Sequence, residues 1–90
     1  MKLFLIHVGF YDPDINEGLY EQHSNYFVVA DNINEAKNKA RQKRIYKKKK
    51  MHIDSIQELN IIDGFRIELI SDKSENDAVS YSYDAVKKLL

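Results

Sequence analysis

Two short stretches of the sequence place a histidine and a carboxylate two positions apart: Glu21 with His23, and His52 with Asp54. In an extended segment, residues two apart point to the same side, so each pair presents an imidazole and a carboxylate together. If the fold brings both pairs side by side, they supply the ligand types of a zinc, iron or manganese centre, or an acid–base pair. The alternative is a hydrogen-bonded tie in which a carboxylate orients a histidine, or plain surface exposure.

This spacing is much weaker evidence than a Cys-x-x-Cys pair or a His-Glu-x-x-His helix. We therefore treat these four residues as a candidate polar binding site and assign no catalytic residue, no metal ligand and no cofactor. Whether the two pairs meet in space decides their role.

A second group of ionisable residues is the basic segment from Lys37 to Lys50, which holds nine of the fourteen lysines and arginines and no acid. The segment carries +9 and the rest of the chain −9, five bases against fourteen acids, so the molecule is strongly dipolar. If one helix continues through it, a basic patch forms from Lys37, Arg41, Arg44 and Lys48. Three interpretations stay open: a solvated helix end, a docking surface for an acidic protein or for the acidic part of the chain itself, and nucleic-acid binding through phosphate contacts.

The composition argues against several classes of function. Nucleic-acid binding is disfavoured because the sequence pI is 6.8 and no recognised nucleic-acid signature is present. With no cysteine there is no thiol nucleophile or thiolate zinc site, and a reducing, cytoplasmic compartment is expected. The three glycines are scattered at positions 9, 18 and 64, so no nucleotide-binding loop is predicted. No apolar run approaches a membrane span, and we expect no membrane partner.

Two strands are predicted at residues 2–9 and 25–31, joined by a long loop over residues 11–24. Loops of this length in a small domain are more often functional than idle, and this one contains the first ionisable pair. His7 alternates with Leu3 and Leu5, so we expect a satisfied histidine in the core or at its edge rather than a ligand.

A helix follows, with Asn32 as its N-cap and Glu35 three residues on, and it should end near Arg44. Ala36 and Ala40 fall on one face. The apolar stripe is narrow, so the helix should lie close on the sheet.

Residues 52–62 and 65–71 are predicted to form two further strands. We predict a three-residue loop between them, with Gly64 in a left-handed conformation, because it pairs apolar residues with apolar residues across the two strands. A two-residue Asp-Gly turn would pair polar residues with apolar ones. Residues 71–77 form a polar linker. The tail is ambiguous between strand and helix at residues 78–83 and helical from Asp84.

The expected fold is therefore α+β with two layers: a mainly antiparallel four-stranded sheet in ββαββ order, one helix on a face, and a C-terminal element. Ninety residues make a single domain, 1–90, with a core over 1–70 and the C-terminal element at 78–90.

The order of these segments resembles a family of small bacterial proteins known as the domain-of-unknown-function 1543 family. The resemblance rests on "KLFLIHVGF", "EQHSNYFVVAD", the helix with Ala36 and Ala40, "HIDSIQEL" and "DGFRIEL". It implies the fold above and points at the two ionisable pairs without assigning them a function. Longer relatives carry the module twice, which implies a homodimer for a single-module chain. The lysines at 47–50 depart from the family pattern, so no role for them follows from it.

We accordingly expect a cytoplasmic, non-catalytic binding or interaction module that self-associates. The alternative is a small metal-binding protein or enzyme that uses Glu21, His23, His52 and Asp54. A third reading is anionic-polymer binding by the basic patch.

Overall fold

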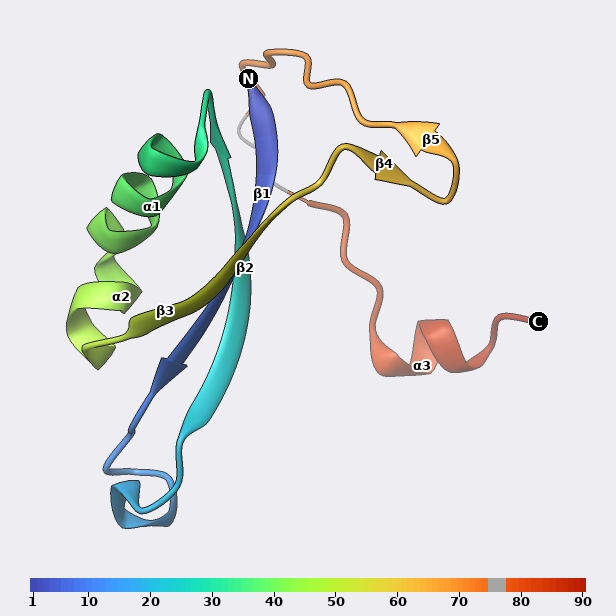
Figure 1. Ribbon diagram of the computed structural model, residues 1–90. Coiled ribbons are helices and arrows are strands. Elements are labelled where there is room, and N and C mark those ends of the chain that lie inside the picture. Colours follow the sequence, from blue (N-terminus) through green and yellow to red (C-terminus); the bar gives the residue numbers. More distant parts are fainter. Residues whose placement is uncertain (75–77) are drawn as a thin grey trace.

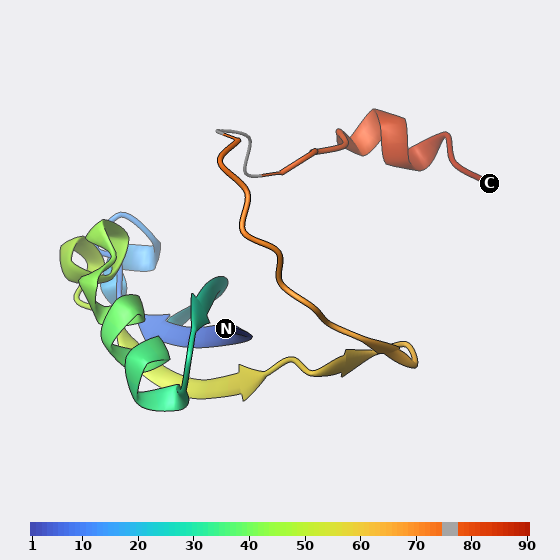
Figure 2. The same ribbon diagram turned by 90° about the horizontal axis from the view of Figure 1, so that it is seen from above.

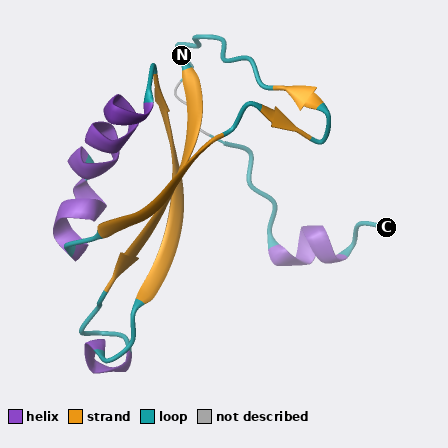
Figure 3. Cartoon of the chain, viewed as in Figure 1, coloured by secondary structure: helices purple, strands orange, loops and turns teal. Residues whose placement is uncertain are grey.

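The computed structural model describes residues 1–74 and 78–90 (Figure 1). Its strands are β1 (Lys2–Phe10), β2 (Gln22–Ala30), β3 (His52–Glu58), β4 (Ile61–Ile62) and β5 (Phe65–Arg66), and its helices are α1 (Ile33–Gln42), α2 (Arg44–Lys49) and α3 (Tyr83–Lys87), with a 3₁₀ turn, η1, at Asn16–Gly18. The α+β class is confirmed, with a three-stranded antiparallel sheet and a separate two-stranded hairpin in place of one four-stranded sheet (Figure 3).

The sheet has the order β2-β1-β3, so the first strand of the chain lies in the middle. Its side chains alternate between two faces. Phe4, Ile6 and Val8 point toward α1 and are almost completely buried. They form the core with five further buried residues: Val28, Ala30, Ala36, Ala40 and Met51. We call this the covered face of the sheet.

The other face of the sheet carries the alternate residues of β1: Leu3, Leu5, His7 and Gly9. None of the described helices packs on this side, because α1 and α2 both lie on the covered face (Figures 1 and 2). We call it the open face. It is apolar toward one end, where Phe27 and Val29 lie beside Leu5 and Leu3, and polar toward the other.

Helix α1 begins as the sequence predicts. The Asn32 side chain accepts a hydrogen bond from the Glu35 amide at 2.9 Å, and the Glu35 carboxylate accepts one from the Asp31 amide at 3.1 Å. The Tyr26 hydroxyl donates to the Ala40 carbonyl at 3.0 Å and so satisfies a backbone acceptor near the helix end. Burial raises the pKa of Tyr26 above its ordinary value.

Two predicted boundaries differ in the structure. Strand β2 begins at Gln22 rather than at residue 25, so His23 lies in a strand and the connecting loop shortens to residues 11–21. Helix α1 ends at Gln42 because Lys43 has an extended backbone, with ψ of 138°, and a second helix starts at Arg44.

The predicted three-residue loop between the last two strands is wrong. Ile62 pairs with Phe65 across a two-residue turn in which Asp63 and Gly64 both have positive φ, 57° and 81°. This is the type I′ turn that Asp-Gly favours. The pairing argument assumed that one face of the hairpin is buried. Ile61 and Phe65 are 62% and 73% exposed, so burial does not select the register and turn chemistry does.

The chain then runs past the sheet to α3, which stands apart from it (Figure 2). Ser82 caps α3 by accepting from the Ala85 amide at 3.2 Å, so the predicted helix from Asp84 is confirmed with a start one residue earlier. Of the predicted linker, residues 71–74 are irregular, and residues 75–77 lie outside the described part of the chain. In the described ranges, no helix has the length and apolar character to cross a membrane.

Candidate metal centre

Three residues form a row across the polar end of the open face. Gly9 of β1 pairs with His23 of β2 on one side and with His52 of β3 on the other. Directly opposed residues in a sheet project to the same face, so both imidazoles rise on either side of the glycine. Glu21 immediately precedes β2 and lies at the same end. The two ionisable pairs are far apart in the sequence, and pairing of β2 and β3 with the central strand β1 brings them together.

A β-bulge in β3 places the fourth residue. His7 pairs with Ser55 and Val8 with Ile53, so Asp54 between them has no partner on β1. Bulges of this kind re-aim side chains. Because Ile53 faces the core, Asp54 turns to the open face beside His52, and the extra residue returns Ile56 to the covered face opposite Ile6. The bulge therefore serves both the site and the core.

Each of the two carboxylates lies within 4 Å of both imidazoles. Glu21 Oε1 is 3.2 Å from His23 Nε2 and 3.5 Å from His52 Nε2. Asp54 Oδ2 is 3.2 Å from His23 Nδ1, and Asp54 Oδ1 is 3.3 Å from His52 Nε2. All four side chains are between 32% and 51% exposed, so the cluster is open to solvent. The structure thus brings Glu21, His23, His52 and Asp54 together.

The glycine in the middle of the row is required by the cluster. A Cβ atom at position 9 would lie 2.5 Å from Glu21 Oε1, 2.6 Å from His52 Nε2 and 2.9 Å from Asp54 Oδ2. Three polar atoms therefore converge on the space that the missing side chain leaves. This use of Gly9 is visible only from the strand pairing.

Hydrogen bonds around the cluster orient Glu21, which belongs to it, and His7, which lies beside it. The Tyr11 hydroxyl donates to Glu21 Oε2 at 3.3 Å, which leaves Oε1 facing the histidines. His7 Nδ1 bonds to Asn25 Oδ1 at 2.7 Å, and its ring stacks on that of His23 with centroids 5.1 Å apart. Such outer hydrogen bonds commonly fix the orientation of metal ligands.

His7 is therefore hydrogen-bonded, as the sequence predicts, but it lies on the open face and not in the core. The face that contains Leu3 and Leu5 also contains Gly9, whereas Phe4, Ile6 and Val8 form an unbroken apolar series. That contrast between the two alternating sets was the available indication that His7 faces the open side. Two groups of possible metal ligands result: His7, His23 and Asp54, and Glu21, His52 and Asp54.

The predicted basic patch is divided by the break at Lys43. Lys37 and Arg41 lie on α1, Arg44 and Lys48 lie on α2, and all four are exposed. One straight helix does not connect them.

A neighbouring lysine outside the predicted patch has the more specific contact. Lys49 donates to Asp12, the one buried acidic residue among those described, and the Asp14 amide donates to the other Asp12 oxygen at 2.9 Å. The hydrogen bond from Lys49 is the main cause that lowers the pKa of Asp12 below its ordinary value. This ion pair joins the 11–21 loop to α2.

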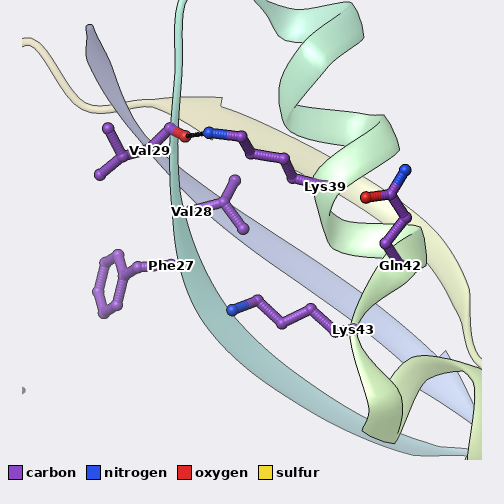
Figure 4. Close-up of a pocket in the computed structure, with 6 residues that line it drawn as sticks. All are labelled: Phe27, Val28, Val29, Lys39, Gln42 and Lys43. Atoms are coloured by element: carbon purple, nitrogen blue, oxygen red, sulfur yellow. Dashed lines mark hydrogen bonds between the residues drawn. The ribbon is translucent and has the colours of Figure 1, made fainter.

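Away from the cluster, a groove of about 500 Å³ runs between α1 and the outer edge of β2 (Figure 4). Lys39 reaches across it and donates to the Val29 carbonyl at 2.7 Å, and the Lys43 ammonium lies 5.8 Å from the centre of the Tyr26 ring. Lysines over an exposed strand edge prevent further strand pairing. We interpret Lys39 and Lys43 as residues that protect the edge of β2 from pairing with another strand.

A family model described as Domain of Unknown Function (DUF1543) matches residues 18–69, more than half of the chain. The match includes Glu21, His23, His52 and Asp54 but begins after β1, which supplies His7 and Gly9. Neither a curated protein nor a solved structure matches the chain.

Proposed function

The chain belongs to the DUF1543 family, whose function is unknown, and we propose that it is a binding module whose ligand is a divalent transition-metal ion held by Glu21, His23, His52 and Asp54. The observation that carries this proposal is the convergence of two imidazoles and two carboxylates over Gly9 on the open face. Imidazole and carboxylate ligands suit zinc, iron and manganese.

The spacing of the ligand atoms supports an ion between them. Ligand atoms about 2.0–2.2 Å from a tetrahedral ion lie about 3.3–3.6 Å from each other. With one nitrogen taken from each histidine, the distances from His52 Nε2 to Glu21 Oε1 and Asp54 Oδ1 and from His23 Nδ1 to Asp54 Oδ2 are 3.2–3.5 Å. Direct N–H···O hydrogen bonds prefer a nitrogen–oxygen distance of about 2.9–3.0 Å, so these contacts are longer than direct histidine–carboxylate hydrogen bonds.

The number of acceptors around His52 also favours a bound ion over a direct histidine–carboxylate hydrogen bond. His52 Nε2 lies 3.5 Å from Glu21 Oε1 and 3.3 Å from Asp54 Oδ1. A single N–H points well at one acceptor, whereas a cation attracts both carboxylates and a nitrogen lone pair together. A divalent ion also neutralises two carboxylates that otherwise repel each other.

The test is metal binding by the full chain after removal of any affinity tag. Isothermal titration with Zn²⁺ and Mn²⁺ should show stoichiometric binding, and Zn²⁺ should raise the thermal unfolding midpoint. His52→Ala and His23→Ala should lose at least tenfold in affinity, while Asp63→Asn in the β4–β5 turn should bind as the wild type does. No stoichiometric binding by the wild type would overturn the proposal.

A second observation favours self-association. The radius of gyration is 15.9 Å, against about 12 Å for a compact chain of this length. Among the described residues after Glu58, none is buried, and large apolar side chains such as Phe65, Ile70 and Tyr83 are mostly exposed. This last third of the chain therefore has apolar surface to bury.

We propose that a second copy of the chain covers this surface. Each copy also exposes Phe27 at the apolar end of its open face, so two copies can exchange equivalent contacts about a two-fold axis. Sedimentation velocity should show a dimer that Phe65→Ser and Phe27→Ser weaken. Tyr20→Ser, in the 11–21 loop, is the matched change at an exposed aromatic residue and should leave it intact. A monomer at every concentration tested would contradict the proposal.

A further inference from the structure

We propose that a pocket between the 11–21 loop and the C-terminal end of α2 binds the phosphate group of a small phosphomonoester. The pocket has a volume of about 470 Å³, and pockets for small molecules are typically about 300–1,000 Å³. Its lining consists of Tyr11, Asp12, Pro13, Lys48, Lys49 and Lys50. None of the four cluster residues is among them, so the pocket is separate from the proposed metal site.

The pocket has a surplus of positive charge. Three lysines and one aspartate line it, which leaves a charge of +2. Lys49 donates to Asp12, so this pair balances itself. In the part of the chain that the structure describes, neither Lys48 nor Lys50 makes an ion pair. The C-terminus of α2 contributes about half a negative charge, which is too little to balance two ammonium groups. An anion can supply the rest.

The buried Asp12 holds both walls of the pocket in place. Its carboxylate accepts from Lys49 on α2 and, at 2.9 Å, from the Asp14 amide in the loop. The hydrogen bond from Lys49 is the main cause of the lowered pKa of Asp12, and the charge of Lys48 also lowers this pKa. The loop and α2 are thus joined before a ligand arrives, and such preorganisation reduces the entropic cost of binding.

The backbone at Lys50 explains how three consecutive lysines can line one pocket. Successive residues of a continuous helix lie about 100° apart around its axis, so three of them spread over roughly 200°. Helix α2 instead ends at Lys49, and Lys50 has a left-handed conformation with a φ of 51°. The chain turns there toward β3. Lys50 leaves the helical path and lies in the same pocket wall as Lys48 and Lys49.

The lining favours a phosphomonoester over other anions. Such a group carries about −1.5 to −2 charges at pH 7, which matches two unpaired ammonium groups, and lysine is a common phosphate-binding residue. The exposed ring of Tyr11 and the ring of Pro13 offer apolar surface to the organic part of the ligand. A nucleic acid would need a longer basic surface, and the break at Lys43 divides that surface.

The test is a titration of the tag-free full chain with phenyl phosphate at pH 7, followed by the chemical shifts of the backbone amides. Saturable shifts should centre on Tyr11, Asp12 and residues 48–50, with a Kd below about 1 mM. Phenyl sulfate has nearly the same shape but a single negative charge, and it should bind about tenfold more weakly. Inorganic phosphate should also bind more weakly, because it lacks the ring.

Variants locate the binding within the lysine run. Lys48→Ala and Lys50→Ala should each weaken phenyl phosphate binding by about fivefold or more. Lys47→Ala is the matched control, since Lys47 belongs to the same run but does not line the pocket, and it should bind as the wild type does. Tyr11→Ser should weaken binding of phenyl phosphate but not of inorganic phosphate.

Three results would overturn the proposal. The first is no saturable shift in the wild type at about 10 mM phenyl phosphate. The second is an equal loss in Lys47→Ala, which would indicate diffuse attraction by the basic segment. The third is tighter binding of oligothymidylate with equal losses in Lys37→Ala and Lys50→Ala, which would indicate a nucleic-acid surface. His23→Ala should keep its affinity for phenyl phosphate, so failure of this proposal and failure of metal binding are distinguishable.

Discussion

The two faces of the β2-β1-β3 sheet differ although they are built from the same strands. The covered face presents Phe4, Ile6 and Val8 to α1 and excludes water, whereas the open face presents His7 and Gly9 and collects ionisable groups. Burial of apolar surface is the main source of folding free energy, and ligand groups need access to solvent. Alternation along β1 therefore places the apolar core and the ionisable cluster on opposite faces of the same strand.

If this separation holds, changes on one face should leave the property of the other face unaltered. The largest effect should come from Ile6→Ala on the covered face, where the side chain is completely buried. The cavity should cost about 2–5 kcal/mol of unfolding free energy, measured by urea denaturation. The folded fraction should bind Zn²⁺ with wild-type affinity. A weaker affinity per folded molecule would show that the faces are coupled.

Gly9→Ala tests the same separation from the open side. The new methyl group would displace the ends of Glu21, His52 and Asp54, so Zn²⁺ affinity should fall by about 100-fold or more, roughly 2.7 kcal/mol. Unfolding free energy without metal should change much less, because the displaced atoms belong to flexible side chains. Ser55→Ala, beside the cluster on β3, is the control and should bind normally. Unchanged affinity in Gly9→Ala would remove the cluster as the metal site.

A smaller effect is expected at the start of α1. Asn32→Ala removes the side chain that accepts from the Glu35 amide and should lower the unfolding free energy by about 1 kcal/mol. Metal binding should not change, since α1 lies on the covered face. Thermal unfolding with and without Zn²⁺ should give the same metal-induced shift in the variant and the wild type.

The smallest effect concerns Asp12, which lies on neither face. Its pKa is lowered by Lys49, so its contribution to stability is present above its ordinary value of 3.8 and is lost as the pH falls through its folded value. Unfolding free energy of the metal-free chain should decline with acid in that range. Asp12→Asn should flatten the decline. An identical acid profile in the variant would show that this ion pair does not contribute.

The features of the fold that depend on residues close together in the sequence could be predicted from it. The Asn32 and Glu35 pair marks the start of α1, Ala36 and Ala40 mark its buried side, and the strand patterns identify β1 and β3. Each of these depends on neighbours within a few positions, which a sequence displays directly.

Features that depend on pairing between strands were not readable in the same way. The role of Gly9 follows from its two partners, His23 and His52, which lie on different strands. The bulge at Asp54 left one indication, because Ile53 and Ile56 are three apart yet both face the core. A regular strand would put them on opposite faces.

The central place of β1 also bears on how the protein is made. This strand is synthesised before β2 and β3, yet one of its two edges finds no partner until His52–Glu58 has been synthesised. Until then the nascent chain holds a two-stranded hairpin, which is marginally stable in water. His52 and Asp54 arrive with the last strand of the sheet, so closure of the sheet and assembly of the ligand set are one event in time. The four side chains of the cluster therefore come together only when β3 joins the sheet.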